Sequence, residues 1–135
     1  MKEIRIGTQL TGGMMITHVS VAIMYVADQD ASLDFYVNKL GFEKKIDEEM
    51  WPGARWVEVV PPKGQTSIVL SSAAAFDKEP GEGAYLTFAC DDIGATVNEL
   101  RERGVTVTDP VEEPWGTYIK ATDPDGHQVQ IAQKD

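Results

Sequence analysis

The sequence predicts an α+β protein made of two tandem βαβββ modules, each with a mixed sheet, joined in one domain. Three observations support this prediction: strand-like and helix-like segments follow one another in the order βαβββ, the same order recurs in the second half, and its landmarks recur at nearly constant spacing. Asp28 and Gly41 return 63 residues later as Asp91 and Gly104, and the turn at Pro62 returns after 62 residues. The 135 residues fit one domain, which typically has about 100–150 residues.

In the first half, residues 16–26 are rich in Val, Ile and Ala and partly alternate, which is typical of a strand. Apolar residues then fall at helical spacing, and Gly41 follows where a left-handed cap is expected, so we expect a helix from about Ala31 to Leu40. Short apolar runs bounded by turns with Pro and Gly predict three further strands, at residues 42–47, 55–60 and 66–71.

The second half repeats this order. Residues 85–90 alternate as a strand, and Asp91 and Asp92 are expected to cap the start of a helix that closes at Gly104. Three more strands are expected at residues 105–108, 117–122 and 128–132. The two modules then cover residues 15–72 and 83–133. Each buries one face of its sheet under its helix and leaves the other face open. Two open faces call for either a shared cavity or a partner.

The composition of the chain argues against two classes of partner. Its 22 acidic and 12 basic residues give a net charge of −10, which repels phosphate backbones and anionic membrane surfaces. No apolar run approaches the roughly 20 residues that span a bilayer. We therefore expect neither nucleic acid nor a membrane as a partner. The single cysteine, Cys90, excludes an internal disulfide, and residues 1–14 do not read as a secretory signal, so we expect a cytoplasmic protein.

Three segments carry a resemblance to a known family. They are the run DQDASLDFY at residues 28–36, LGF at residues 40–42 and DPDG at residues 123–126. In these segments the chain resembles the vicinal oxygen chelate superfamily, which includes glyoxalase I, bleomycin resistance proteins, extradiol dioxygenases and fosfomycin resistance enzymes. The resemblance implies paired modules whose curved mixed sheets form a cup-shaped pocket, commonly in a homodimer. It implies no particular reaction, because one fold hosts many functions.

The resemblance covers residues 16–133 and therefore leaves the start of the chain out. Residues 1–14 match nothing in the superfamily, and we expect them to be an N-terminal extension that is either disordered or a non-native start. Residues 15–135 are then a single domain of the glyoxalase/bleomycin resistance/dioxygenase type.

Enzymes of this superfamily hold a divalent metal with His, Glu or Gln side chains on the open sheet face, where the metal polarises a substrate oxygen. The resemblance places the usual ligand positions on Gln130, Tyr85 and Val69. A neutral amide is a poorer ligand than a carboxylate, and the other two side chains do not suit a divalent ion. We therefore predict no bound metal and no cofactor.

Two histidines remain to be considered as ligands. His18 lies on the first predicted strand but precedes Asp28 by ten residues, whereas the superfamily's histidine precedes this aspartate by seven. His18 and Gln130 are therefore only weak metal candidates. His127 follows the turn at Gly126, and we expect it to be a solvated turn residue.

Period-two alternation predicts which side chains face the pocket, since neighbouring residues of a strand point to opposite faces. The resulting ligand-binding candidates are Trp56, Glu58, Tyr85, Thr87, Tyr118, Lys120, Gln128 and Gln130. An aromatic wall beside a carboxylate suits a planar or cationic guest. Trp51 and Trp115, on adjoining loops, either line the pocket or contact a second subunit. Glu58 and Lys120 occupy equivalent places in the two modules and could form an internal ion pair, and Glu58 is also a weak candidate for a catalytic base.

These observations lead to two functional hypotheses. The preferred one is a metal-free homodimer that sequesters a cationic or aromatic small molecule, as the superfamily's bleomycin resistance proteins do. The alternative is a metal-dependent glyoxalase-type lyase or extradiol-type dioxygenase with a divergent ligand set, which would use Ni, Mn, Fe or Zn. That enzyme would work through His18, Glu58, Tyr85 or Gln130.

Overall fold

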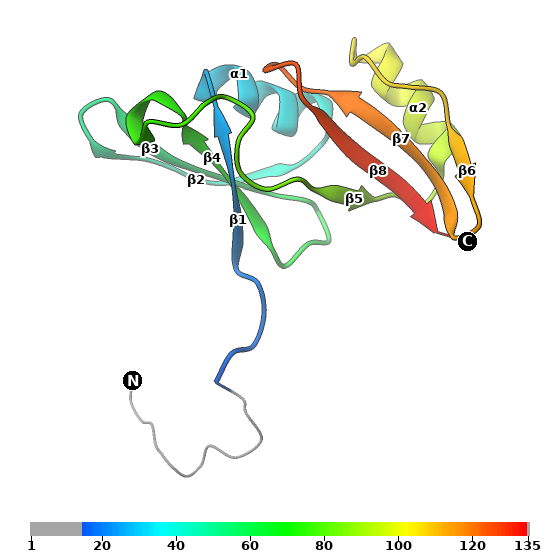
Figure 1. Cartoon of the computed structure of the whole chain (residues 1–135), viewed down its shortest axis with the longest axis horizontal. Helices are drawn as coiled ribbons and strands as arrows, with labels where there is room; N and C mark the ends of the chain where they lie inside the picture. Colours follow the sequence, from blue (N-terminus) through cyan, green and yellow to red (C-terminus); the bar gives the residue numbers. More distant parts are fainter. Residues whose placement is uncertain (1–14, 135) are drawn as a thin grey trace.

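The computed structural model describes residues 15–134 and contains two four-stranded mixed sheets (Figure 1). The first sheet has the order β1-β4-β3-β2, and the second repeats it as β5-β8-β7-β6. In each sheet the first two strands of this order, β1 with β4 and β5 with β8, run parallel to one another. The remaining neighbours are antiparallel. The strands are β1 (Val21–Val26), β2 (Glu43–Trp51), β3 (Ala54–Val60), β4 (Ser67–Ser72), β5 (Thr87–Ala89), β6 (Val111–Glu113), β7 (Gly116–Thr122) and β8 (Gln128–Lys134). The predicted α+β fold with a duplicated βαβββ order is confirmed, whereas the expectation for residues 1–14 lies outside the described residues.

Each module has one main helical segment between its first two strands. In the first module, α1 (Gln29–Leu33) continues as the π-helical turn η2 (Asp34–Lys39), and the second module has α2 (Ile93–Glu102). A short 3₁₀ turn, η3 (Ala74–Phe76), follows β4. Within residues 15–134, no helix has the length and apolar character needed to cross a membrane.

The helix boundaries follow from the residues that the sequence marked. The Asp28 carboxylate accepts hydrogen bonds from the backbone N–H groups of Asp30 and Ala31 at 2.9 and 3.1 Å. Asp92 does the same for Ala95 at 3.0 Å. These contacts satisfy amides that have no partner within the first helical turn. The chain leaves both helices through a glycine with positive φ, as predicted for Gly41 and Gly104.

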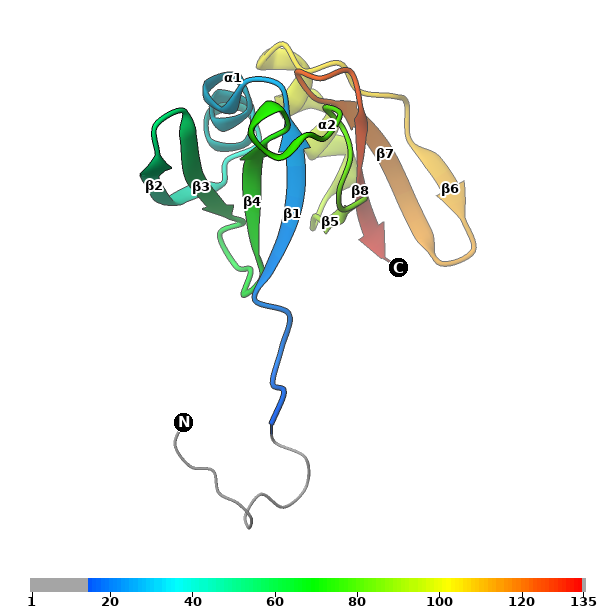
Figure 2. The same cartoon turned by 60° about the vertical axis from the view of Figure 1, so that its left-hand side comes forward.

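A linker joins the two sheets along β1. Met24 forms an isolated antiparallel bridge with Gly83, and the flanking hydrogen bonds run from Tyr25 N–H to the Glu82 carbonyl and from Ala84 N–H to the Ile23 carbonyl, at 2.9 and 2.8 Å. The chain then enters β5. The two sheets therefore lie side by side, with β1 and β5 as the neighbouring edges (Figure 2).

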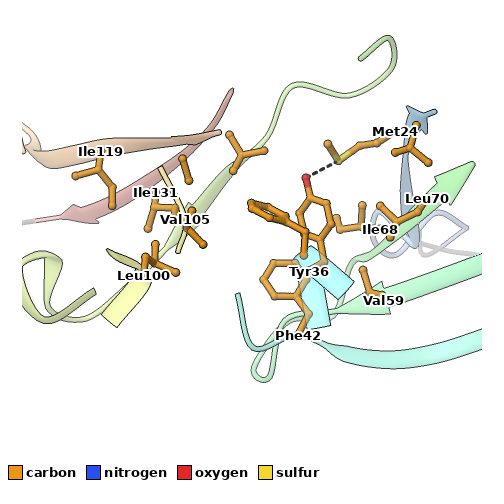
Figure 3. Close-up of a cluster of buried hydrophobic side chains, with 14 of the residues drawn as sticks. Met24, Tyr36, Phe42, Val59, Ile68, Leu70, Leu100, Val105, Ile119 and Ile131 are labelled. Atoms are coloured by element: carbon orange, nitrogen blue, oxygen red, sulfur yellow. Dashed lines mark hydrogen bonds between the residues drawn. The ribbon is translucent and has the colours of Figure 1, made fainter. Parts of the chain in front are cut away.

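One hydrophobic core spans both modules. Tyr36 is fully buried, and its hydroxyl lies 3.7 Å from the Met24 sulfur (Figure 3). The rings of Phe42 and Phe88 meet edge to face at 5.0 Å and connect the two halves. The core contains the residues that alternation placed on the covered faces, namely Val57, Val59, Ile68, Leu70, Ile119, Ala121, Val129 and Ile131. The predicted register of the faces is therefore confirmed.

The strand predicted at residues 105–108 differs from the structure. Only Val107 forms a bridge there, with Ala121, and the ladder of β6 begins at Val111. Pro110 interrupts the pairing because proline has no backbone N–H to donate. The register also shifts by one residue between the bridge and the ladder, since Val107 pairs with Ala121 but Val111 pairs with Tyr118.

A substitution at Gly83 tests the contact between β1 and the linker that joins the two sheets. A Cβ atom there would lie 2.4 Å from the Ile23 carbonyl oxygen, and the residue has φ +106°. We predict that Gly83→Ala lowers the free energy of unfolding by about 1–3 kcal/mol. Gly94→Ala in α2, where the nearest atom lies 3.6 Å away, should raise it by up to about 1 kcal/mol. Urea denaturation measures both, and equal stability of the two variants would contradict the prediction.

Candidate ligand-binding site

The open face of the first sheet is organised around Glu58. This residue is only 6% exposed, and its carboxylate accepts a hydrogen bond of 2.9 Å from the Trp56 indole N–H. The Lys45 ammonium lies 3.6 Å from the other carboxylate oxygen. Lys45 lies at an irregularity of β2, because Lys44 pairs with Val59 but Ile46 already pairs with Glu58. A bulge of this kind redirects a side chain, which places Lys45 next to Glu58.

These contacts set the ionisation of Glu58. Burial opposes the charged form, but the hydrogen bonds from Trp56 and Ser67 and the charge of Lys45 outweigh it and hold the pKa of Glu58 below its ordinary value. The carboxylate is therefore ionised and fully engaged at neutral pH. A general base works best with a pKa near the operating pH, which this group does not have. The interpretation of Glu58 and Lys120 as an ion pair is wrong, because Lys45 is the partner of Glu58.

The remainder of this face is filled by the protein's own side chains. Ser67, Val69 and Ser71, which alternate with the core residues Ile68 and Leu70 on β4, are buried. At the end of the sheet, the Phe76 ring packs edge-on against Trp51 at 5.8 Å and against Tyr25 at 6.4 Å. The first sheet therefore offers a guest mainly the edges of aromatic rings.

The second sheet presents a different open face. Thr87, Gln130 and Lys120 lie in register across β5, β8 and β7. Thr87 is exposed, and the other two are partly buried. The next row consists of Ala89, Ala132 and Tyr118. The two short alanine side chains form the floor of this part of the face, where Ala89 is exposed and Ala132 is 6% exposed.

An aromatic pair borders this floor. Trp115, from the turn between β6 and β7, stacks on Tyr118 with ring centroids 6.0 Å apart and planes inclined by 14°. Trp115 remains 46% exposed. The sequence left Trp115 open between pocket and subunit contact, and its place near Tyr118 on the same hairpin is the signal that could have favoured this pairing.

A hollow of about 460 Å³ lies between the linker and the ends of β7 and β8. It is lined by Lys120, Tyr85, Gln128, His127 and the linker backbone. Tyr85 is 67% exposed at its rim. The expectation that His127 is a solvated turn residue is wrong, because its Nε2 donates a hydrogen bond of 2.8 Å to the Gly81 carbonyl and its ring is mostly buried.

The predicted ligand-binding residues thus divide between two sheets. Trp56 and Glu58 lie on β3 of the first sheet and are hydrogen-bonded to one another, whereas Thr87, Tyr118, Lys120, Gln128 and Gln130 lie on strands of the second sheet and Tyr85 precedes β5. Their contact with a ligand stays a prediction.

The residues near the candidate metal positions do not fit a divalent ion. His18 is exposed and precedes β1, in a segment that extends away from both sheets, and its ring contacts Thr17 at 2.8 Å (Figure 1). The neighbours of Gln130 in register are a hydroxyl group and the Lys120 ammonium, which repels cations. Among residues 15–134, no three His, Cys, Asp or Glu side chains form a group that could hold a metal.

Comparison with known proteins agrees with this geometry. Residues 15–131 match the Glyoxalase/Bleomycin resistance protein/Dioxygenase superfamily. The chain belongs to this superfamily. The match covers nearly all of the described residues, so the resemblance noted in the sequence is confirmed, and the superfamily accounts for both modules together.

Three proteins illustrate what the chain is similar to. TnmS3, an antibiotic binding protein from Streptomyces sp. CB03234, is 35% identical with a TM-score of 0.80, over 90% of this chain and 99% of that one. A superfamily member from Sphaerobacter thermophilus is 38% identical with a TM-score of 0.80, over 90% of this chain and 100% of that one. The uncharacterized protein YetH of Bacillus subtilis is 32% identical, over 84% of this chain and 95% of YetH.

The engaged carboxylate of Glu58 leads to a prediction on stability. Because its pKa is lower in the folded protein, Glu58 stabilises the fold above its ordinary pKa and loses this effect as the pH falls through the folded value. We predict that Glu58→Gln lowers the free energy of unfolding by about 1–3 kcal/mol at pH 7. The difference from the wild type should shrink as the pH falls from about 5 to 3.

The matched control is Glu48→Gln, since Glu48 lies opposite Trp56 on the same face and is exposed. This change should leave stability within about 0.5 kcal/mol of the wild type at pH 7. Urea denaturation at several pH values measures both variants. A Glu58→Gln difference that stays constant down to pH 3 would show that ionised Glu58 is not the stabilising group.

Proposed function

We propose that the protein binds and sequesters a small aromatic compound on the open face of its second sheet, without a bound metal ion. One observation carries this proposal: the exposed Trp115–Tyr118 stack borders a flat floor next to the polar row of Thr87, Gln130 and Lys120. Ligand sites typically combine apolar or aromatic walls with a few convergent polar groups.

The similarity to TnmS3 supports a binding role. That protein binds an antibiotic, and it matches this chain over nearly the whole length of both. Sequestration requires affinity alone, which stacking and hydrogen bonds supply. The sequence analysis expected a cationic or aromatic guest, and the cationic guest would need the carboxylate of Glu58. That carboxylate is already engaged by Trp56 and Lys45. The proposal therefore keeps the aromatic part.

The same proposal includes the cytoplasm as the site of action and a homodimer as the working form. The lone Cys90 is compatible with a reducing compartment. Three apolar side chains ahead of β1, Met15, Ile16 and Val19, are 73%, 86% and 64% exposed in the single chain. Exposed apolar side chains in one segment favour contact with another protein surface.

The dimer predicts a concentration-dependent mass. Sedimentation equilibrium of the wild type should give twice the mass of the 14.8 kDa chain. The double change Ile16→Asp and Val19→Asp should shift the protein to the monomer without unfolding it, since both residues are exposed. A monomeric wild type at micromolar concentration would contradict the dimer and would leave the binding proposal standing.

Trp115 tests the binding site. We predict that chelator-treated protein binds 2-naphthamide, a neutral planar probe, and that Trp115→Ala weakens binding about 2- to 10-fold through loss of stacking. Trp51→Ala, which removes an equivalent exposed indole from the first sheet, should leave the affinity unchanged. Isothermal titration calorimetry measures both. Binding that appears only after Ni²⁺ or Mn²⁺ is added, or conversion of the probe to a product, would refute the metal-free binding function.

A further inference from the structure

We infer that the natural guest of this site is an aromatic anion whose carboxylate or phenolate pairs with Lys120. This inference rests on the proposed function, because it concerns the same face of the second sheet. It specifies the sign of the guest's charge, which neither the superfamily nor its relatives fix.

The charges on the two open faces indicate that the guest is negatively charged. On the first sheet, the Glu58 carboxylate is neutralised by Lys45 at 3.6 Å. On the second sheet, no carboxylate of residues 15–134 lies within 4 Å of the Lys120 ammonium. Lys120 is partly buried and lines the hollow beside the linker. An ammonium group without a protein counterion favours an anion as its partner.

The acid that β6 contributes opposite β7, Glu113, is too distant to serve as that partner. Glu113 is paired with Gly116, four residues along β7 from Lys120. This separation corresponds to about 13 Å at the rise of a strand. Gly116 also pairs with Lys134 of β8, so Glu113 and Lys134 lie in the same row of the sheet. The ammonium of Lys120 is therefore available to a guest.

The neighbours of Lys120 complete an acceptor-binding row. The Gln130 amide and the Thr87 hydroxyl lie in register beside it, and both can donate hydrogen bonds to oxygen atoms. A charge-assisted hydrogen bond from the ammonium is about twice as strong as a neutral one. A carboxylate or phenolate can accept bonds from all of these groups, whereas an ammonium guest would be repelled by Lys120.

The spacing of the rows explains why the anion should be aromatic. Tyr118 and Lys120 are two residues apart on the same face of β7. Two residues of a strand span about 7 Å, which matches an aromatic ring with an attached carboxylate. A guest that places its acid group at Lys120 therefore brings its ring over Ala132 and against the Tyr118–Trp115 stack.

The net charge of −10 does not prevent this binding. At physiological ionic strength, charges beyond about 8 Å are largely screened, so the local ammonium determines the affinity. The overall negative charge should slow association more than it weakens the complex.

Three naphthalene probes of nearly equal shape test the sign of the charge: 2-naphthoate, 2-naphthamide and 2-naphthylmethylammonium. Calorimetry with chelator-treated wild-type protein at 0.15 M salt should give binding of the naphthoate on the order of tenfold tighter than the amide. The ammonium probe should bind more weakly than both. An affinity for the cation equal to or above that for the anion would overturn the inference while leaving the proposed function intact.

Lys120→Met removes the charge and keeps the length of the side chain. In this variant, naphthoate and naphthamide should bind with equal affinity. Lys44→Met changes the net charge equally but lies on the helix-covered side of the first sheet, opposite Val59, and should keep the preference for the anion. A preference that survives Lys120→Met would assign it to another group and refute the inference. If none of the three probes binds to the wild type, the proposed function itself fails.

Discussion

The alternation of apolar and polar residues along each strand is the constraint on which the rest of this structure depends. Successive side chains of a strand point to opposite faces, so a strand that contributes Ile119 and Ala121 to the core must present Tyr118 and Lys120 on the other side. A shift of one residue would reverse every side chain. The core fixes this register, because contacts such as Phe42 with Phe88 join the covered faces of both modules. The composition of the open faces is therefore a consequence of packing on the opposite side.

The two modules use the same topology for different purposes. Glu58 and Lys120 stand at equivalent places, 62 residues apart, but among residues 15–134 only Glu58 has a countercharge within 4 Å. The bulge at Lys45 brings an ammonium to Glu58, and Trp56 donates to the same carboxylate, so the first sheet satisfies its own polar groups. The second sheet has small residues at Ala89 and Ala132 beside the row of Thr87, Gln130 and Lys120. Duplication thus yields one face that is internally satisfied and one on which we propose that a guest binds.

Local patterns in the sequence predicted the framework well. The cap at Asp92, the glycines that end both helices and the core register of the strands all depend on neighbouring residues, and the structure confirms them. The features that sequence reasoning missed depend on contacts between distant residues. The His127 ring binds the carbonyl of Gly81, 46 residues away, and Lys45 reaches Glu58 through an extra residue in β2 that no composition signals. The strand at 105–108 was wrong because pairing is re-established only beyond Pro110.

The central claim is that the guest occupies the open face of the second sheet through stacking and an ammonium contact, with no metal ion involved. A crystal structure of the chelator-treated protein with bound 2-naphthoate tests this claim most directly. The account predicts the naphthalene ring against Tyr118 and Trp115, and the carboxylate within hydrogen-bonding distance of the Lys120 ammonium. Density for the probe against Trp56 on the first sheet, or an anomalous peak from a transition metal between the probe and Gln130, would contradict it.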